Sequence, residues 1–110
     1  MTFNIWLSGA NVENGLQKIA TNILQVDPDI VTLQEVTSTA VFDNLLDLLG
    51  SSWKGVTKNL SYPDTAIITK HKFMNASTAM TTWSIGARIF VSTLNTVVSV
   101  WNLHLNYKYC

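Results

Sequence analysis

The first half of the chain alternates between strand-like and helix-like spacing of apolar side chains. From Thr2 to Leu7 every second residue is apolar, which is the period of a strand with one buried face. An apolar stripe at helical spacing follows Asn11, a plausible helix cap, and ends near Asp27 because Pro28 disfavours helical backbone at the residue before it. The short apolar run from Ile30 to Leu33 predicts a strand that is covered on both faces.

A second helix is predicted directly after this strand. Ser38 or the neighbouring Thr37 can cap its first turn, and Gly50 fits the C-terminal cap. Its buried stripe is formed by apolar residues at helical spacing, namely Val41, Phe42, Leu45, Leu46 and Leu49.

Beyond Gly50 the pattern indicates strands alone. Five segments have this character: Trp53 to Lys58, Thr65 to Thr69, Ala76 to Trp83, Ala87 to Leu94 and Val97 to Leu103. Asn95-Thr96 is a tight connection that is consistent with a hairpin. The order is therefore βαβα followed by a β meander. We predict an α/β fold with a mixed sheet, parallel at first and antiparallel later, and helices on one face.

The composition indicates a small polar surface for a chain of this size. The chain has 110 residues, enough for one domain, and 47% of them are hydrophobic while 13% are charged, against a typical charged share of about 25%. This balance suits a segment whose apolar surface is covered by more protein. Seven basic and seven acidic residues cancel, so strong electrostatic attraction to nucleic acid is not expected from this segment.

Little in the sequence indicates a cellular compartment. The single cysteine, Cys110, is the last residue, so no internal disulfide is expected. We find no pattern of a signal peptide and no apolar run long enough to cross a membrane. Two triplets that begin at Asn59 and Asn75 fit the glycosylation pattern, which often occurs by chance. The localisation stays open, secretion of the parent protein included.

Glu35 is the most informative polar residue. It lies just past the end of the predicted strand Ile30 to Leu33, and ligands of open α/β sheets gather at the carboxyl ends of parallel strands. A lone, partly buried carboxylate there suits a hard cation such as Mg²⁺, which keeps several of its waters. The alternative is a solvated glutamate at a strand end.

Four further residues are candidates for a site. Asn4 lies within the first strand, where its amide needs hydrogen-bond partners. It can hold Glu35, a metal-bound water or a phosphate oxygen, or it can be a structural amide that bonds to a neighbouring loop. His104 shares a strand face with Asn102 and can donate to a phosphate oxygen, although a lone histidine is more often structural. Arg88, the only arginine, can clamp a phosphate or face solvent. His71, between two lysines, is interpreted as a surface residue.

The arrangement of these residues resembles that of a known family. The runs that carry the resemblance are Thr2-Phe3-Asn4-Ile5-Trp6, Gly15-Leu16-Gln17-Lys18-Ile19-Ala20, Pro28-Asp29-Ile30-Val31-Thr32-Leu33-Gln34-Glu35-Val36, Asp64-Thr65-Ala66-Ile67-Ile68-Thr69-Lys70 and Val100-Trp101-Asn102-Leu103-His104-Leu105. They are similar to the opening of the endonuclease/exonuclease/phosphatase (deoxyribonuclease-I-like) superfamily. The resemblance implies that residues 1–110 are a partial domain of this family, truncated at the C-terminus. The implied fold is the N-terminal half of a four-layer α/β/β/α sandwich.

The same resemblance implies roles for the candidate residues. Glu35 would bind a divalent metal, Mg²⁺ or Mn²⁺, with Asn4 helping to set the site. His104 would contact the scissile phosphate, and Arg88 and Asn102 are weaker candidates for that contact. The substrate would be a phosphoester, whether nucleic acid, phosphoinositide or phospholipid.

Two segments that the family needs are absent from this sequence. Neither a Gly-Asp-x-Asn segment, which prepares the attacking water, nor a Ser-Asp-His segment occurs. Asn106 also stands where relatives often have an acidic residue. We therefore expect an N-terminal fragment of a metal-dependent phosphoesterase that is inactive by itself.

Two other classes of function are alternatives to this interpretation. The first is a non-catalytic α/β interaction module that binds a partner, or a second copy of itself, through an exposed sheet face. The second is a hydrolase with a Ser or Cys nucleophile, which is disfavoured because no nucleophile elbow or paired base is present.

Overall fold

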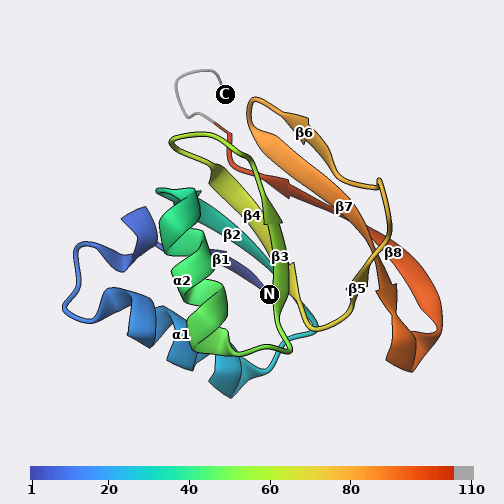
Figure 1. Ribbon diagram of the computed structural model, residues 1–110, viewed down its shortest axis with the longest axis horizontal. Helices are drawn as coiled ribbons and strands as arrows, with labels where there is room; N and C mark the ends of the chain where they lie inside the picture. Colours follow the sequence, from blue (N-terminus) through green and yellow to red (C-terminus); the bar gives the residue numbers. More distant parts are fainter. Residues whose placement is uncertain (106–110) are drawn as a thin grey trace.

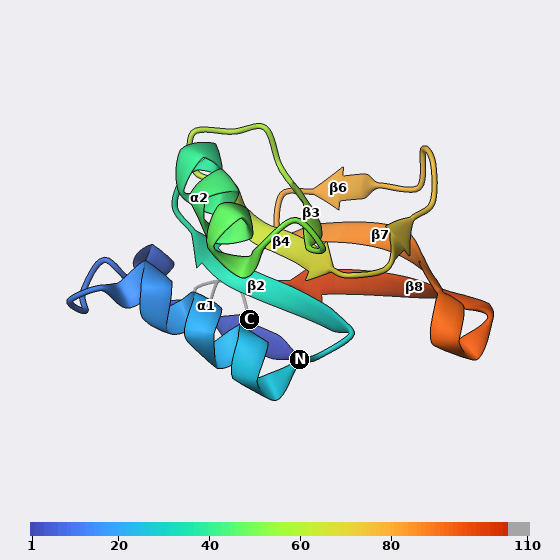
Figure 2. The ribbon, with the colours of Figure 1, turned by 60° about the horizontal axis from the view of Figure 1, so that its bottom comes forward.

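Two helices and two stacked sheets form three layers (Figures 1 and 2). The structure is a computed structural model and describes residues 1–105 of the chain. In the first sheet the strand order is β1-β2-β4-β3, with bounds β1 Thr2–Asn4, β2 Ile30–Val36, β4 Asp64–Thr69 and β3 Lys54–Thr57. The second sheet contains β5 Lys72–Phe73, β6 Ala79–Thr81, β7 Ser84–Val91 and β8 Thr96–Leu103. The helices are α1 Gly15–Val26 and α2 Thr39–Leu49, and two 3-10 turns are η1 Leu7–Gly9 and η2 Ser92–Leu94.

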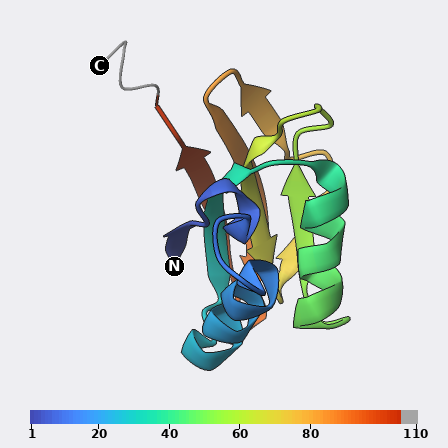
Figure 3. The ribbon, with the colours of Figure 1, turned by 90° about the vertical axis from the view of Figure 1, so that its left-hand side faces the viewer.

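The first sheet is mixed, as the order of elements predicts. β1 pairs with β2 in parallel, whereas β4 pairs with β2 and β3 antiparallel. The two helices lie together on one face of this sheet (Figure 3), and the second sheet, which is antiparallel throughout, covers the other. The prediction of an α/β fold with helices on one face is confirmed.

The alternation of β4 divides the core between the two layers. Ala66 and Ile68 point to the helices and join the larger cluster with Ile23 of α1 and Leu45 of α2. Ile67 points the opposite way and packs with apolar residues of β7, namely Ile85, Ala87, Ile89 and Val91. Because successive side chains of a strand face opposite sides, β4 needs apolar residues on both faces at its centre, and this produces the run Ala66-Ile67-Ile68 in the sequence.

Several elements begin or end away from their predicted bounds. β1 stops at Asn4 because Trp6, Leu7 and Ser8 adopt left-handed backbone, with φ of 44°, 55° and 57°. α1 begins at Gly15 rather than after Asn11, because Asn14, also left-handed, stands at its N-cap. The cap at Ser38 is confirmed: its hydroxyl accepts from the backbone N–H of Val41 at 3.1 Å.

The later strands also differ in extent. The predicted strand Ala76 to Trp83 shortens to β6, and the one that begins at Ala87 starts earlier, at Ser84. β7 ends at Val91, and η2 with the left-handed Asn95 makes the turn into β8 in place of a two-residue hairpin.

A buried asparagine connects the two sheets. The Asn102 side chain on β8 is 2% exposed, and its Nδ2 donates to the carbonyls of Leu33 at 2.7 Å and Ala66 at 2.8 Å. Its Oδ1 accepts from Nε2 of Gln34 at 2.8 Å. The pairing of β2 with β4 shifts register just after Leu33, so the amide meets these carbonyls where the ladder is interrupted.

The outer face of the second sheet carries large apolar side chains. Trp101 and Leu103 of β8 are more than half exposed. The Trp101 ring lies over Gly86 of β7, where an added Cβ would meet ring atoms at 2.5 Å. Neither α1 nor α2 is long and apolar enough to cross a membrane, and they are the only α-helices within residues 1–105.

Replacing Asn102 with Ala should destabilise the fold by more than about 2 kcal/mol, because the buried carbonyls of Leu33 and Ala66 would lose the Asn102 donor, at roughly 1–3 kcal/mol each. Urea denaturation of the purified chain measures this loss. Ser99→Ala, at an exposed position of the same strand, is the control and should change stability by less than about 0.5 kcal/mol. Equal stability of the two variants would show that the bridge contributes little.

Candidate functional site

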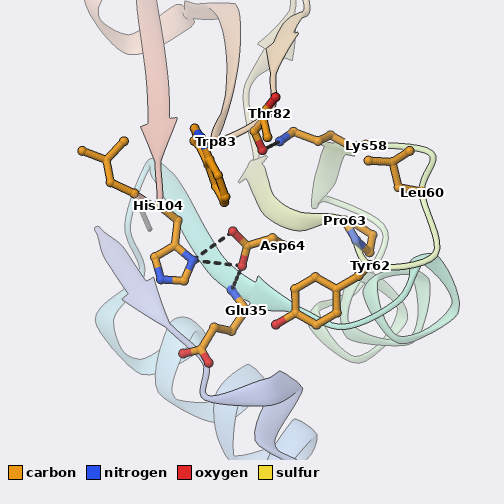
Figure 4. A pocket seen from close by; sticks show the side chains of 10 residues that line it. Glu35, Lys58, Leu60, Tyr62, Pro63, Asp64, Thr82, Trp83 and His104 are labelled. Atoms are coloured by element: carbon orange, nitrogen blue, oxygen red, sulfur yellow. Dashed lines mark hydrogen bonds and ion pairs between the residues drawn. The ribbon is translucent and has the colours of Figure 1, made fainter. Parts of the chain in front are cut away.

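Glu35 lies at a bulge inside β2. Its backbone is left-handed, with φ of 67°, and the strand continues to Val36, so the residue is not past the strand end as predicted. Its N–H donates to Oδ1 of Asp64 at 3.0 Å, and its carbonyl accepts from the Ser8 hydroxyl at 3.4 Å. These contacts hold the backbone, while the carboxylate extends away from Asp64 toward the β1–η1 turn (Figure 4).

A carboxylate–histidine pair lies beside Glu35. Nδ1 of His104 is 3.0 Å from Oδ1 and 2.9 Å from Oδ2 of Asp64. His104 directly follows β8, and its backbone N–H donates to the carbonyl of Trp83 at 3.0 Å. The structure therefore brings together two residues, Glu35 and His104, that lie 69 positions apart in the sequence.

Asp64 is the functional candidate that the sequence reasoning missed. It belongs to the run from Asp64 to Lys70 that carries the family resemblance, which by itself assigns it no role. A signal was present, because a carboxylate between Pro63 and the strand Thr65 to Thr69 lies at the start of an antiparallel neighbour of β2. β4, the antiparallel neighbour, starts beside the end of β2, where Asp64 pairs with Val36. Without the pairing of β4 with β2, however, the sequence does not show that Asp64 meets Glu35.

These three side chains line a cavity of about 510 Å³. The rest of its wall comes from the β3–β4 loop, the β6–β7 turn and the residue after His104, namely Lys58, Leu60, Tyr62, Pro63, Thr82, Trp83 and Leu105. The ammonium of Lys58 is not a free charge, because it is buried and donates to the carbonyl of Thr82 at 3.1 Å.

The phenol of Tyr62 responds to the electrostatics of this cavity. Burial is the first cause that raises its pKa above the usual value, and the negative charges of Asp64 and then Glu35 raise it further. The cavity therefore disfavours an additional negative charge in the absence of a cation.

Asn4 lies near the cavity but does not line it. It ends β1 opposite Gln34, the residue before Glu35. The side chain is exposed, and its Oδ1 accepts from the N–H of Trp6 at 2.9 Å. Asn4 instead lines a second cavity of about 340 Å³ between β1, η1 and α1.

Arg88 and Asn102 do not join the cavity. Arg88 is exposed on β7 opposite Ser99 and is not among the lining residues. Asn102 shares the face of His104, as predicted, but both of its amide hydrogens are already donated to backbone carbonyls. A phosphate contact by either residue is therefore disfavoured.

The interpretation of His71 as a surface residue is wrong. Its side chain is 11% exposed, and Nε2 lies 2.9 Å from Oδ1 of Asp29. This hydrogen bond is the main reason that the pKa of the Asp29 carboxyl is lowered. Asn106 and Cys110, which also figured in the sequence analysis, lie outside the described residues.

The donor set fits one hard cation that keeps most of its waters. Within residues 1–105, no three His, Cys, Asp or Glu side chains are grouped closely enough to form a protein cage for a metal. The Asp64 carboxylate is bonded to His104 and to the N–H of Glu35. Glu35 is thus the carboxylate left to bind a cation, and Mg²⁺ commonly binds through one or two carboxylates and several waters.

Comparisons with known proteins show the family and the fold of this chain. A model of the Endonuclease/Exonuclease/phosphatase family matches residues 1–106. An uncharacterized Caenorhabditis elegans protein, F14F9.5, is 50% identical over 107 residues, which are 97% of this chain and 33% of that protein. This chain therefore spans about a third of the relative's length.

A solved structure shares the fold. The crystal structure of humanized D. rerio TDP2 with 14 mutations superposes with a TM-score of 0.66 at 18% identity. The match covers 97% of this chain and 47% of that one.

Asp64→Asn should lower the pKa of Tyr62 toward its usual value, because a negative charge that opposes the phenolate is removed. Glu35→Gln should lower it less, since Glu35 is the smaller cause, and Asp43→Asn on the exposed side of α2 should not change it. NMR titration of labelled tyrosine rings, assigned with Tyr62→Phe, gives the values. An unchanged pKa in Asp64→Asn would contradict the arrangement of the cavity.

Proposed function

Because the chain belongs to the Endonuclease/Exonuclease/phosphatase family, we propose that residues 1–110 supply the metal and phosphate contacts of a divalent-metal-dependent phosphoesterase. The observation that supports this best is that Glu35 and the Asp64–His104 pair line one cavity. The family acts on phosphoesters, nucleic acids among them. The reaction proposed for this protein is hydrolysis by metal-assisted attack of water, on a phosphodiester or a phosphomonoester.

Glu35 is the proposed ligand of the metal, Mg²⁺ or Mn²⁺. When bound, such an ion neutralises phosphate charge as a Lewis acid. The bulge directs the carboxylate out of the strand, and the bonds of its backbone to Asp64 and Ser8 fix that direction. Asn4 is proposed as a positioning residue, because it caps the turn from which Ser8 reaches Glu35.

His104 is the proposed contact to the scissile phosphate. When Nδ1 donates to Asp64, Nε2 is the ring atom left to face a phosphate oxygen, and a protonated Nε2 donates to it. The carboxylate of Asp64 contacts Nδ1 through both oxygens and so sets the orientation of the ring. Asp64 is therefore a positioning residue for His104.

We also propose that these 110 residues do not complete the site. The Gly-Asp-x-Asn and Ser-Asp-His segments that the resemblance implies do not occur in the sequence. In a complete relative they would supply the groups that prepare and orient the attacking water.

A second candidate function is an interaction surface. The exposed Trp101 and Leu103 on the outer face of the second sheet support it, as does β8, which pairs with β7 alone among the described strands. A module of this kind, which binds a partner or a second copy of the chain, has no use for a metal. Magnesium binding therefore distinguishes the two candidates.

Mg²⁺ should bind the chain through Glu35 and lower the pKa of Tyr62, because a cation beside the carboxylate offsets one of the charges that raise it. Glu35→Gln should weaken Mg²⁺ affinity by more than about 10-fold. Loss of a residue that only hydrogen-bonds to a metal ligand already weakens metal affinity by about 10-fold or more, and loss of the ligand itself should cost more. Isothermal titration calorimetry measures the affinity and tyrosine NMR the pKa. Asp43→Asn is the control, and equal affinity of wild type and Glu35→Gln would contradict the metal site.

The purified 110-residue chain should not hydrolyse bis(p-nitrophenyl) phosphate in Mg²⁺ or Mn²⁺ above the rate of the metal alone. Lack of a general base by itself typically reduces the rate by about 10²–10⁴-fold. Release of nitrophenolate, followed by absorbance, measures the rate. Turnover that Glu35→Gln abolishes would show that the site is complete within these residues.

A further inference from the structure

The cavity beside Glu35 and His104 has an aromatic half. Tyr62 lies in the β3–β4 loop and Trp83 in the β6–β7 turn, and the rings of both line the cavity. Leu60 and Leu105 line the same cavity. Tyr62 is 46% exposed and Trp83 is 40% exposed, so both rings present free surface. Figure 4 shows the two rings on different sides of Asp64, each near the carboxylate–histidine pair.

Both rings are attached to the backbone that holds this pair. The carbonyl of Trp83 accepts the N–H of His104 at 3.0 Å. Tyr62 precedes Asp64 by two residues, and the residue between them is Pro63, which is fully buried. A group that stacks on these rings is thus held at a fixed position relative to a phosphate at His104.

The charges of the cavity disfavour a ligand with several phosphates. Lys58 is the one cationic side chain among the lining residues other than His104, and its ammonium is buried against the Thr82 carbonyl. Recognition of clustered phosphates requires several free Arg or Lys side chains. The free surface consists instead of aromatic faces and leucine side chains, which suit a flat, uncharged ring.

We propose that the Tyr62–Trp83 half of the cavity binds an unpaired nucleobase attached through its sugar to the phosphate at Glu35 and His104. This inference rests on the proposed function and names its substrate class, a nucleotide or single-stranded nucleic acid. Stacking on aromatic side chains accepts any base, because every base has a π face. A base inside a duplex has both faces covered and must first leave the stack.

The balanced charge of the chain favours the same class. Binding to a duplex depends on basic residues along the backbone track, whereas this segment has equal numbers of basic and acidic residues. A single nucleotide unit needs one phosphate contact and one stacking contact, and the cavity offers both.

Binding of four small probes to the 110-residue chain in Mg²⁺ tests the proposal: thymidine 5′-monophosphate, ribose 5-phosphate, thymidine and hexyl phosphate. Chemical shift changes and NMR titration give each affinity. The nucleotide should bind at least about 5-fold more tightly than ribose 5-phosphate, which is the lower end of what one stacked base contributes. Its ring protons should show contacts with the Trp83 indole of the wild-type chain, a readout that requires no variant.

Trp83→Leu and Tyr62→Leu should each reduce the preference for the nucleotide and leave the affinity for ribose 5-phosphate unchanged. Trp101→Leu is the matched control, because it removes an exposed tryptophan outside the cavity. The NMR spectrum of each variant shows whether it is folded.

The outcomes separate this proposal from the function on which it rests. If thymidine 5′-monophosphate and ribose 5-phosphate bind with equal affinity, and Glu35→Gln weakens both, the base site is overturned and the phosphoesterase proposal stands. Binding of thymidine that depends on Trp83, with no tighter binding of the nucleotide and no binding of ribose 5-phosphate or hexyl phosphate, would overturn the phosphoesterase proposal and retain a base site. Tighter binding of hexyl phosphate than of the nucleotide would overturn the base site in favour of an alkyl group. Failure of all four probes to bind would overturn both proposals.

Discussion

The amide of Asn102 is the contact on which the arrangement of the molecule depends. It reaches from the second sheet into the first and satisfies the carbonyls of Leu33 and Ala66 at the point where β2 and β4 lose register. Apolar packing between the sheets is non-directional and permits sliding. Directional hydrogen bonds in a buried site do not, because sliding would take the Asn102 donor away from the carbonyls of Leu33 and Ala66. Asn102 therefore fixes how β8 lies on β2.

The candidate site follows from this alignment. His104 stands two residues after Asn102, and Glu35 stands two residues after Leu33, so the bridge places the ends of the two strands together. Asp64 then joins them, since it accepts the N–H of Glu35 and contacts His104. Asn102, a candidate for phosphate binding in the sequence, thus contributes to the site by positioning other residues and not by contact with a phosphate.

Unfavourable backbone conformations gather at this end of the first sheet. Trp6, Leu7, Ser8, Glu35 and Asp64 all have positive φ, at a typical cost of about 1–3 kcal/mol for each such residue. Hydrogen bonds of Asn4, Ser8 and Asp64 to the local backbone offset part of this cost. The consequence is that β1 ends early and β2 bulges, which directs the Glu35 carboxylate away from the strand. Strain of this kind is typical of functional sites.

The sequence by itself determined the βαβα order of the first elements, the apolar stripes of the two helices and the position of His104 directly after a strand, because periodicity and turn residues are local properties. It placed Asn102 and His104 on one face for the same reason. It did not reveal the bulge at Glu35, the partner of His104 or the contact of His71 with Asp29, and it left Arg88 open. These depend on which strands pair and in what register, and pairing joins residues far apart in the chain, such as Asp64 and His104. Only the tertiary structure decided them, because local spacing carries no information about such contacts.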